Sequence, residues 1–491
     1  MEKEKTKKEL YKDGTKVIEE IKNKINNSPD IVVKKTSFSN NDIYIVFSEP
    51  LCDQTIINEF ILEYFEGSNV KVKKSDIVEH INQYMPTRKT TKVSDFETLF
   101  YNLLSGFTVI IIDGSETALS VENRSKLDSG ISESKNEFIM KGPKDAFTEN
   151  YETNIGQIRR RIKNENLWLE ELVVGERSKT KIGFMYINDI ADKEIVDTVI
   201  DKIKNIEIDS IMGSNYIIDL ISENKKNSFP NYLSTERPDF VAMHLLEGRI
   251  AIVVENSPFV VIIPALFVDF FHSTEDLYQK TINISYTRII RIIALIITLL
   301  IPPIYIAITT YNHEAIPETL LINFAAQRSG VPFPTIIEAL LMMITFEVLR
   351  ETNLRIPSTL GNALSIVGAI VLGEAAVSAG IVSPIMVIVI AITSISGLTV
   401  SSFDIINAVR WWRVIFIISA ALSGLIGLLL ATIAFIVNLV SIKSFGIPYL
   451  SPLAPFIKNT NSDTIFQSNK DKFNYRNNLT AAKNPHRSKG E

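Results

Sequence analysis

Several features that support chemistry in other proteins are missing from this sequence. Its 491 residues include one cysteine, Cys52, so an intrachain disulfide and a cysteine-based zinc site are excluded. The sequence contains no GxxxxGK[ST] loop, no GxGxxG in a strand–helix context and no GxSxG motif. We therefore predict no catalytic residue, no cofactor and no enzyme. No metal is expected either, because the histidines lack metal-ligand spacing and are scattered at His80, His244, His272, His313 and His486.

Charge is also unevenly distributed. The formal net charge is only -5, which excludes the concentrated basic surface of a nucleic-acid partner. Lysine is absent between Lys280 and Lys443, whereas both ends of the chain are rich in it, as expected for a region that mostly meets lipid. The first residues lack the apolar core of a signal peptide. We expect residues 1–41 to be a charged, solvated arm and the soluble part to be cytosolic; the alternative for Lys16 to Ile25 is an amphipathic helix.

Residues 42–285 alternate strand-like and helix-like segments, which favours largely parallel sheets covered by helices. Phe107 to Asp113 and Thr180 to Ile187 are predicted strands, and Arg249 to Phe267 reads as a hairpin turning at Asn256-Ser257. Asp113, at the end of a predicted strand, is either a site residue or part of an ordinary turn. We place two subdomains at 42–166 and 167–285.

Residues 286–442 are predicted to form an all-α polytopic membrane domain, followed by a polar, basic tail at 443–491. Small residues at helical spacing favour a packed bundle or oligomer. Five apolar segments are candidates for membrane helices: Ile289–Ile308, which Pro302-Pro303 should kink, Ile336–Leu349, Ala363–Ile381, Pro384–Val400 and Val414–Ile442.

The positive-inside rule places both ends of the chain in the cytoplasm, which requires an even number of crossings. The short, charged segment Ile336–Leu349 is then the natural re-entrant or interfacial element. Four crossings, however, would put Arg410 and Arg413 outside, which the same rule disfavours. The residues alone leave this conflict open.

Ionisable residues inside the apolar segments are the candidate functional residues, because charge in a membrane usually faces protein or water. Pro332 and Pro334 precede a helix and are candidates for a hinge or helix entrance. Glu338 is either cavity-facing or interfacial, whereas Glu347 and Arg350 are spaced for a local structural ion pair.

Glu374 lies in the middle of an apolar segment, where it could serve an ion path or an interhelical hydrogen bond. In the soluble part, Arg159, Arg160 and Arg161 are consecutive and could, with Arg124 and Lys141, meet phosphate, acidic lipid or another subunit. The alternative is an ordinary solvated surface.

Two blocks of the chain resemble the A subunits of spore germinant receptors, the GerA family: KGPKDAFTENYETNIGQIRRRI (Lys141 to Ile162) and the stretch from Arg328 to Pro384. The order and length of most of the chain, from about Asp42 to the tail, also agree. Two departures are Ala146, where the family usually has glycine, and Glu374, where glutamine is common. The residues of the first block that carry the soluble-domain motif are Gly142, Pro143, Phe147, Glu149, Asn154, Arg159 and Arg161.

The resemblance implies an α/β soluble N-terminal region of two subdomains, cytoplasmic, followed by the polytopic domain in the spore inner membrane. It implies a nutrient-responsive receptor with a transporter-like B subunit, a lipoprotein C subunit and a self-oligomer that conducts ions through the lipid membrane. Related sporulation-stage membrane proteins share both blocks, but the long polar tail favours the receptor branch.

Two other functions make different predictions. A secondary transporter would show an internal repeat within 286–442, and none is visible. A membrane-anchored enzyme would need a nucleophile, phosphate loop or metal site in the α/β region.

Overall fold

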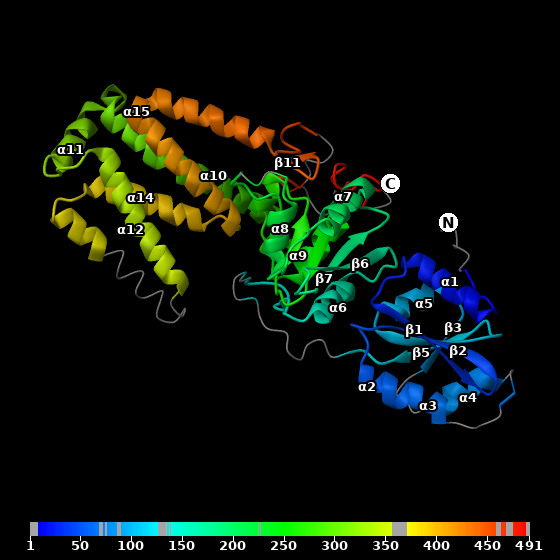
Figure 1. The fold of residues 1–491 in the computed structure, drawn as a ribbon. Coiled ribbons are helices and arrows are strands. Elements are labelled where there is room, and N and C mark those ends of the chain that lie inside the picture. Colours follow the sequence, from blue (N-terminus) through cyan, green and yellow to red (C-terminus); the bar gives the residue numbers. More distant parts are fainter. Residues whose placement is uncertain are drawn as a thin grey trace.

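The computed structural model describes residues 8–67, 72–73, 76–85, 90–125, 134, 137, 139–223, 225, 227–355, 371–457, 463–467 and 475–487. Two α/β units and a helical bundle follow one another in a row, and the C-terminal segment returns to the second unit (Figure 1). The fold is therefore an α/β N-terminal region followed by a helical region, as predicted.

The first unit is a five-stranded antiparallel sheet in the order β1-β2-β4-β5-β3, with helices on both faces (Figure 1). α1 and α5 cover one face and α2, η1, α3 and α4 cover the other, each over its own apolar core. The elements are α1 (Gly14–Lys24), β1 (Ile31–Phe38), β2 (Asn41–Ser48), α2 (Gln54–Ile56), η1 (Ile57–Leu62), α3 (Glu63–Gly67), α4 (Ile77–Tyr84), β3 (Thr90–Val93), α5 (Phe96–Leu103), β4 (Phe107–Ile112) and β5 (Ala118–Glu122).

The second unit repeats this design with the strand order β6-β7-β9-β10-β8. α7 and α8 cover one face, whereas α6 and α9 cover the other, and the core of that second face continues into the helical bundle. The elements are α6 (Tyr151–Arg161), β6 (Leu167–Val174), β7 (Thr180–Ile187), α7 (Lys193–Lys204), α8 (Ser214–Ile221), β8 (Leu233–Thr235), α9 (Pro238–Leu246), β9 (Ile250–Val254), β10 (Val260–Ile263), η3 (Phe267–Phe271) and η4 (Thr274–Tyr278).

The prediction of largely parallel sheets is wrong, because neighbouring strands in both five-stranded sheets pair antiparallel. Alternating strands and helices predict a layered fold, but strand direction depends on the end of the sheet to which each connection returns. The predicted hairpin is confirmed: β9 and β10 pair antiparallel, and Asn256 in their turn has a φ of 61°.

The predicted N-terminal arm is also wrong for the residues that the structure describes. α1 and β1 lie inside it, and Val17 and Ile21 on α1 are fully buried. Asp113 accepts a hydrogen bond from the Gly14 N–H at 3.0 Å, which fixes the start of α1 at the sheet. The division at Asn166 is displaced too, because α6 packs in the core of the second unit.

The bundle contains two helices, α10 and α15, that are long and apolar enough to cross a membrane by length and composition, with mean hydropathies of 2.5 and 2.6. α10 continues through Pro302 and Pro303. Residues 371–378 are also helical, and the part of Ala363–Ile381 before residue 371 lies outside the described residues. The elements are α10 (Thr281–Thr310), η5 (His313–Ala315), α11 (Glu318–Arg328), α12 (Thr335–Arg355), α14 (Pro384–Leu398) and α15 (Phe403–Ser441).

The prediction that Val414–Ile442 is one long span is wrong, because α15 folds back on itself at Gly424. The φ of 60° and ψ of -137° at Gly424 are not helical. The Trp412 and Phe435 rings lie 5.1 Å apart, although in a straight helix 23 residues would separate them by about 35 Å. α15 is therefore a pair of antiparallel helices, visible as the folded orange segment in Figure 1.

Both ends of this helical hairpin lie at the second α/β unit. At the C-terminal end, Asn438 contacts Asn227 at 3.5 Å. The tip of the hairpin lies at the far end of α10, where Tyr311 donates to the carbonyls of Ala421 and Leu422 at 2.9 and 3.1 Å. At the N-terminal end, Asp404 of α15 lies near Tyr232 of the second unit. Burial, and then the charges of Asp404 and Asp219, raise the pKa of Tyr232.

The predicted polar tail packs against the second unit. β11 (Lys443–Ser444) and β12 (Ile447–Pro448) form a small hairpin, after which Tyr449 and Ala481 are fully buried. A Cβ on Gly248 would lie 2.5 Å from the Thr480 carbonyl oxygen, so this glycine admits the tail backbone. The tail and both α/β units therefore lie at the same end of the bundle.

Candidate functional site

The loop that opens the soluble-domain motif packs against the segment that leads into α10. Gly142 has a φ of +130°, and a Cβ there would lie 2.6 Å from the Tyr278 ring. The Pro143 carbonyl accepts a hydrogen bond from Arg237 at 2.6 Å. Glycine is required at this position, both for its backbone conformation and for the close approach of the ring.

The middle of the motif fixes the start of α6. The buried Asn154 side chain accepts from the Thr148 N–H at 2.8 Å and donates to the Thr148 carbonyl at 2.6 Å. Phe147 is buried, and its N–H donates to the Glu236 carbonyl at 2.7 Å. Glu149 is exposed and contributes its carbonyl, which accepts from Asn256 at 3.2 Å.

Arg159 joins the two α/β units. Its side chain is 1% exposed and forms a bidentate ion pair with Asp30, which lies between α1 and β1 and is equally buried. The guanidinium also donates to Ser28 at 2.9 Å and to the Leu167 carbonyl at 3.0 Å. The hypothesis that Arg159 meets phosphate or acidic lipid is therefore wrong, because its donors are used inside the protein.

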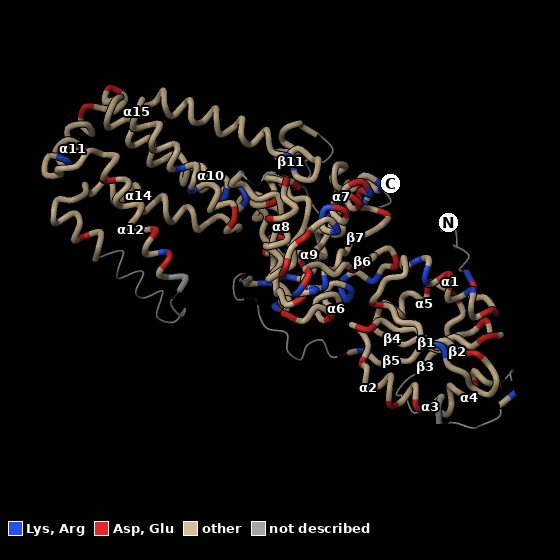
Figure 2. Tube along the Cα trace, viewed as in Figure 1, with Lys and Arg blue, Asp and Glu red and all other residues tan. Residues whose placement is uncertain are grey.

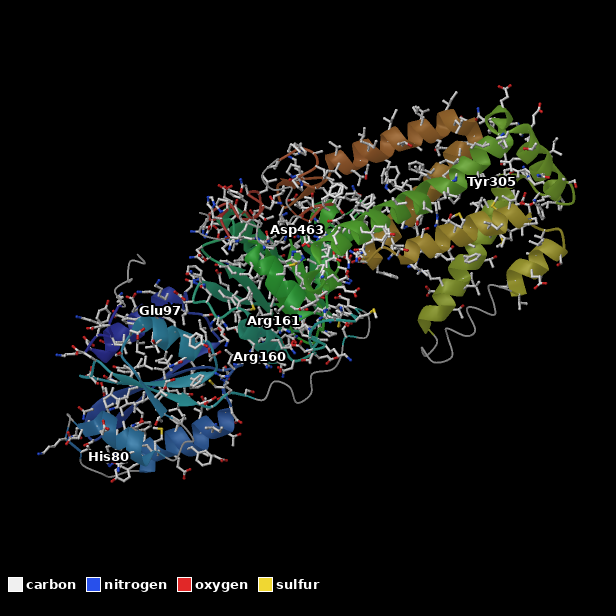
Figure 3. All side chains as sticks on the ribbon, turned by 180° about the vertical axis from the view of Figure 1, so that it is seen from behind. His80, Glu97, Arg160, Arg161, Tyr305 and Asp463 are labelled. Carbon is white, nitrogen blue, oxygen red and sulfur yellow. The ribbon has the colours of Figure 1, made fainter. Side chains whose placement is uncertain are left out.

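Arg161 is engaged in the same way. One of its amino groups contacts both carboxylate oxygens of Asp145 at 2.8 Å. Figure 3 shows Arg160 and Arg161 at the end of α6 that lies beside the first unit. A spacing of about 100° per residue explains why three consecutive arginines have different surroundings.

A chain of buried ion pairs continues from this motif to α10. Arg237 pairs with Asp239, which also accepts from the Tyr278 hydroxyl at 2.6 Å. A second group of ion pairs surrounds Arg288 in the first turns of α10, which contacts Asp276 at 3.1 Å and Asp463 of the tail, labelled in Figure 3, at 2.6 Å.

Sequence reasoning missed these residues: Arg237 and Asp239 are only two residues apart and resemble an ordinary surface pair, whereas Arg288 and Asp463 are 175 residues apart. Ion pairs at such a junction can couple the soluble units to the helices, provided that they have two arrangements.

In the bundle, α12 begins at Thr335, directly after Pro334, whose carbonyl accepts from the Glu338 N–H at 3.2 Å. α12 extends to Arg355, beyond the short segment predicted. Pro332 lies in the preceding loop, and the hinge role of the two prolines stays a prediction.

Glu338 is fully buried. Its carboxylate accepts from the Ser383 N–H at 2.9 Å at the start of α14 and lies 3.5 Å from the Nε of Arg328. The Glu338 side chain is thus held between α11, α12 and α14 and meets protein rather than lipid.

Glu347 has its ion-pair partners on another helix, and not one turn away as predicted. Arg410 on α15 forms a bidentate pair with it, and Arg413 lies 3.5 Å away. Arg350 instead lies over the Phe403 ring, 4.9 Å from its centroid, and donates to Asn407 at 3.4 Å. The two residues therefore cross-link α12 to the start of α15.

Glu374 is exposed on the helix at residues 371–378. The structure does not bring it near Glu338 or Glu347 through any contact between described residues. Among those residues, no group of three histidine, cysteine, aspartate or glutamate side chains is placed to hold a metal ion.

The family model described as Bacillus/Clostridium GerA spore germination protein matches residues 19–479 of this chain. This chain belongs to the GerA family. The resemblance seen in the two blocks is confirmed, and GerA membership gives the chain a role in spore germination.

The relatives match over nearly their whole length. Spore germination protein KA of Bacillus subtilis is 40% identical over 455 residues, 92% of this chain and 84% of that protein. GerQA of Bacillus cereus is 33% identical over 441 residues, 90% of this chain and 87% of that protein. The N-terminal domain of the A subunit of the Bacillus megaterium germinant receptor GerK3 is 32% identical, with a TM-score of 0.42 over 54% of this chain and 99% of that domain.

Apolar helices and relatives together indicate a membrane protein. One relative, YfkQ of Bacillus subtilis, carries the description of an uncharacterized membrane protein and is 34% identical over 443 residues, 89% of this chain and 86% of that protein. Charged residues crowd the α/β units and are sparse along α10, α14 and α15 (Figure 2). The helical region thus has the composition that lipid requires.

Proposed function

We propose that this chain is the A subunit of a nutrient-responsive germinant receptor and that it oligomerises to form an ion-conducting channel in the spore inner membrane. Its partners are a transporter-like B subunit and a lipoprotein C subunit, and the α/β units lie in the cytoplasm. Relatives named as spore germination proteins, together with the GerA match over residues 19–479, support this assignment.

The observation that carries the channel proposal is Glu374. A single chain leaves this carboxylate exposed on a helix whose neighbouring residues are apolar. A carboxylate facing acyl chains is costly, so Glu374 requires water or another chain beside it. A ring of subunits around a water-filled opening supplies both.

The fold of α15 supports the cytoplasmic placement. Because α15 reverses at Gly424, the first turns of α15, which end at Arg410, lie toward the α/β end of the bundle, together with the basic tail. The positive-inside rule then favours the same side for Arg410 and the tail, which supports the cytoplasmic placement of both. Counting α15 twice also makes the number of candidate helices even, so α12 no longer has to be re-entrant.

The ion pairs at the junction provide a route for the signal. Nutrient binding to the complex shifts the bundle only if the open arrangement binds better than the closed one. Arg237, Asp239 and Tyr278 connect the motif to the entrance of α10, and Arg288 connects α10 to the tail. A change at the α/β units therefore acts directly on a helix of the bundle.

The test is ion efflux from spores that carry Glu374→Leu, Glu374→Gln or Glu338→Ala, measured after addition of nutrient. We expect Glu374→Leu to abolish efflux and Glu374→Gln to retain much of it, because the amide remains polar. Glu338→Ala should slow efflux, since it leaves the buried Ser383 N–H without its carboxylate acceptor, at a cost of about 1–3 kcal/mol. Normal efflux at normal protein levels in Glu374→Leu would contradict the channel proposal.

A further inference from the structure

An open groove of about 780 Å³ lies between α12 and the first half of α15. Three arginines and two glutamates line it together with apolar side chains. The charged residues are Arg350, Arg410, Arg413, Glu347 and Glu351. The groove is therefore more cationic than anionic and lies in a part of the chain where charge is otherwise sparse.

The positive charge in the groove is not fully used by the protein. Arg410 donates two hydrogen bonds to the Glu347 carboxylate. Arg413 lies further from the same carboxylate, at 3.5 Å. The Arg413 side chain is only 8% exposed, and its Nε has no hydrogen-bond partner among the residues that the structure describes. A buried guanidinium N–H without an acceptor is costly, which indicates that an anionic group completes the site.

Arg350 provides a second available cation. Its guanidinium stacks on Phe403 and makes one long hydrogen bond, 3.4 Å to Asn407. A planar guanidinium presents five N–H donors and suits a phosphate group. Most of the donors of Arg350 are therefore free for a ligand in the groove, within the described part of the chain.

The groove is amphipathic along its length. Arg350 and Phe403 lie toward the α/β units, because Asp404 is close to Tyr232, and the charged lining continues along α15 to Arg413. Leu340 and Met343 extend the apolar lining along α12, about two to three turns further into the bundle than Arg350. Trp411, 71% exposed beside the groove, is the residue type that marks the membrane–water boundary.

We propose that this groove binds one anionic glycerophospholipid, with its phosphate at Arg350 and Arg413 and an acyl chain along Leu340 and Met343. The lipid's negative charge and its apolar chain match the two ends of the groove, whereas a free phosphate ion would use only one. The inference rests on the proposed membrane embedding of the bundle, but not on its ion conduction. The bound lipid would bridge α12 and α15 at the level where the signal from the α/β units arrives.

The experiment is native mass spectrometry of the purified full-length chain in detergent, with added phosphatidylglycerol or phosphatidylcholine of the same acyl chains. We expect phosphatidylglycerol to be retained preferentially. Arg350→Gln should weaken that retention about tenfold or more, because one charge-assisted hydrogen bond to phosphate is lost. Lys280→Gln is the matched control, since Lys280 is exposed at the same end of the bundle outside the groove.

Arg413→Gln should have the same effect as Arg350→Gln, with the melting temperature of each variant recorded. Arg350→Gln keeps the Glu347–Arg410 pair and is expected to fold, so the test does not depend on Arg413. Equal retention of the two lipids, or full retention by Arg350→Gln, would overturn the proposal. The proposal would also be overturned if glycerol phosphate at the same concentration displaced phosphatidylglycerol. The same holds if the chain formed a dimer that Arg350→Gln dissociates, because a second copy would then occupy the groove. Because this experiment measures lipid retention and not germination, a negative result would not contradict the proposed receptor function. A negative result in the ion-efflux test would likewise not contradict lipid binding.

Discussion

Replacing Arg159 by methionine should separate the two α/β units. The arginine and Asp30 are each 1% exposed, and their bidentate pair joins α6 to the loop before β1. Methionine approximates the volume of the arginine stem but offers no donor. The buried Asp30 carboxylate then keeps the hydrogen bond from the Ser28 hydroxyl at 2.7 Å but loses its cationic partner.

The expected cost follows from the burial of the pair. Breaking a buried ion pair by removing one partner costs about 3–5 kcal/mol, because the remaining charge is left uncompensated. Lysine at the same position should not restore it, since a single ammonium cannot reproduce the bonds to Asp30, Ser28 and Leu167. Arg177→Met is the matched control, because Arg177 and Asp209 are 84% and 65% exposed and such pairs contribute at most about 1 kcal/mol.

Hydrogen exchange of the full-length protein in detergent measures this cost locally. Arg159→Met should speed exchange around Ser28 to Ile31 and in β6 by two to three orders of magnitude, about 3–4 kcal/mol, and leave α14 unchanged. A double-mutant cycle with Asp30→Asn isolates the pair. Exchange rates within about fivefold of the unmodified protein, or additive effects of the two substitutions, would refute the reasoning.

Two further predictions concern the bundle and the junction. Gly424→Ala should lower the melting temperature, because a left-handed backbone costs a non-glycine residue about 1–2 kcal/mol and the added Cβ would lie 2.8 Å from Tyr311. Gly330→Ala is the control and should change the melting temperature little, because the space around an added Cβ is open. An unchanged melting temperature in Gly424→Ala would argue against the reversal in α15. Burial, and then nearby Glu49 and Glu171, raise the pKa of Glu152 to about 7, above that of an unfolded chain, so stability should fall as the pH rises from about 4.5 through 7. Glu152→Gln should flatten this dependence in urea unfolding monitored between pH 5 and 8, and an identical pH profile in the variant would contradict the assignment.

The sequence was sufficient to predict several strands and helices but not the directions in which the strands pair. Phe107 to Asp113 and Thr180 to Ile187 were recognisable as strands because their apolar runs and flanking turns are local signals. Strand direction is not local, and both sheets proved antiparallel. α1 matches the amphipathic alternative for Lys16 to Ile25, which ranked below the solvated arm because lysines dominate the composition of that segment.

The candidate site shows the same limit. Glu338 and Glu347 could be selected from the sequence because charge inside an apolar run is rare and costly. Their partners, Ser383 and Arg410, lie 45 and 63 residues away, where no periodicity connects them. The reversal at Gly424 was hidden because a glycine within an apolar helix is also common in straight membrane helices.

The most direct test of the account is the side of the membrane on which each end of the bundle lies. Single cysteines at Lys12, Ser401 and Lys483, and at Glu314 beyond the end of α10, would be labelled by an impermeant maleimide in inverted and in right-side-out vesicles. Cys52 is buried and would be replaced by serine. The account predicts that Lys12→Cys, Ser401→Cys and Lys483→Cys react only in inverted vesicles and Glu314→Cys only in right-side-out vesicles. Labelling of Lys12→Cys and Lys483→Cys from opposite sides, or of Ser401→Cys and Glu314→Cys from the same side, would contradict it.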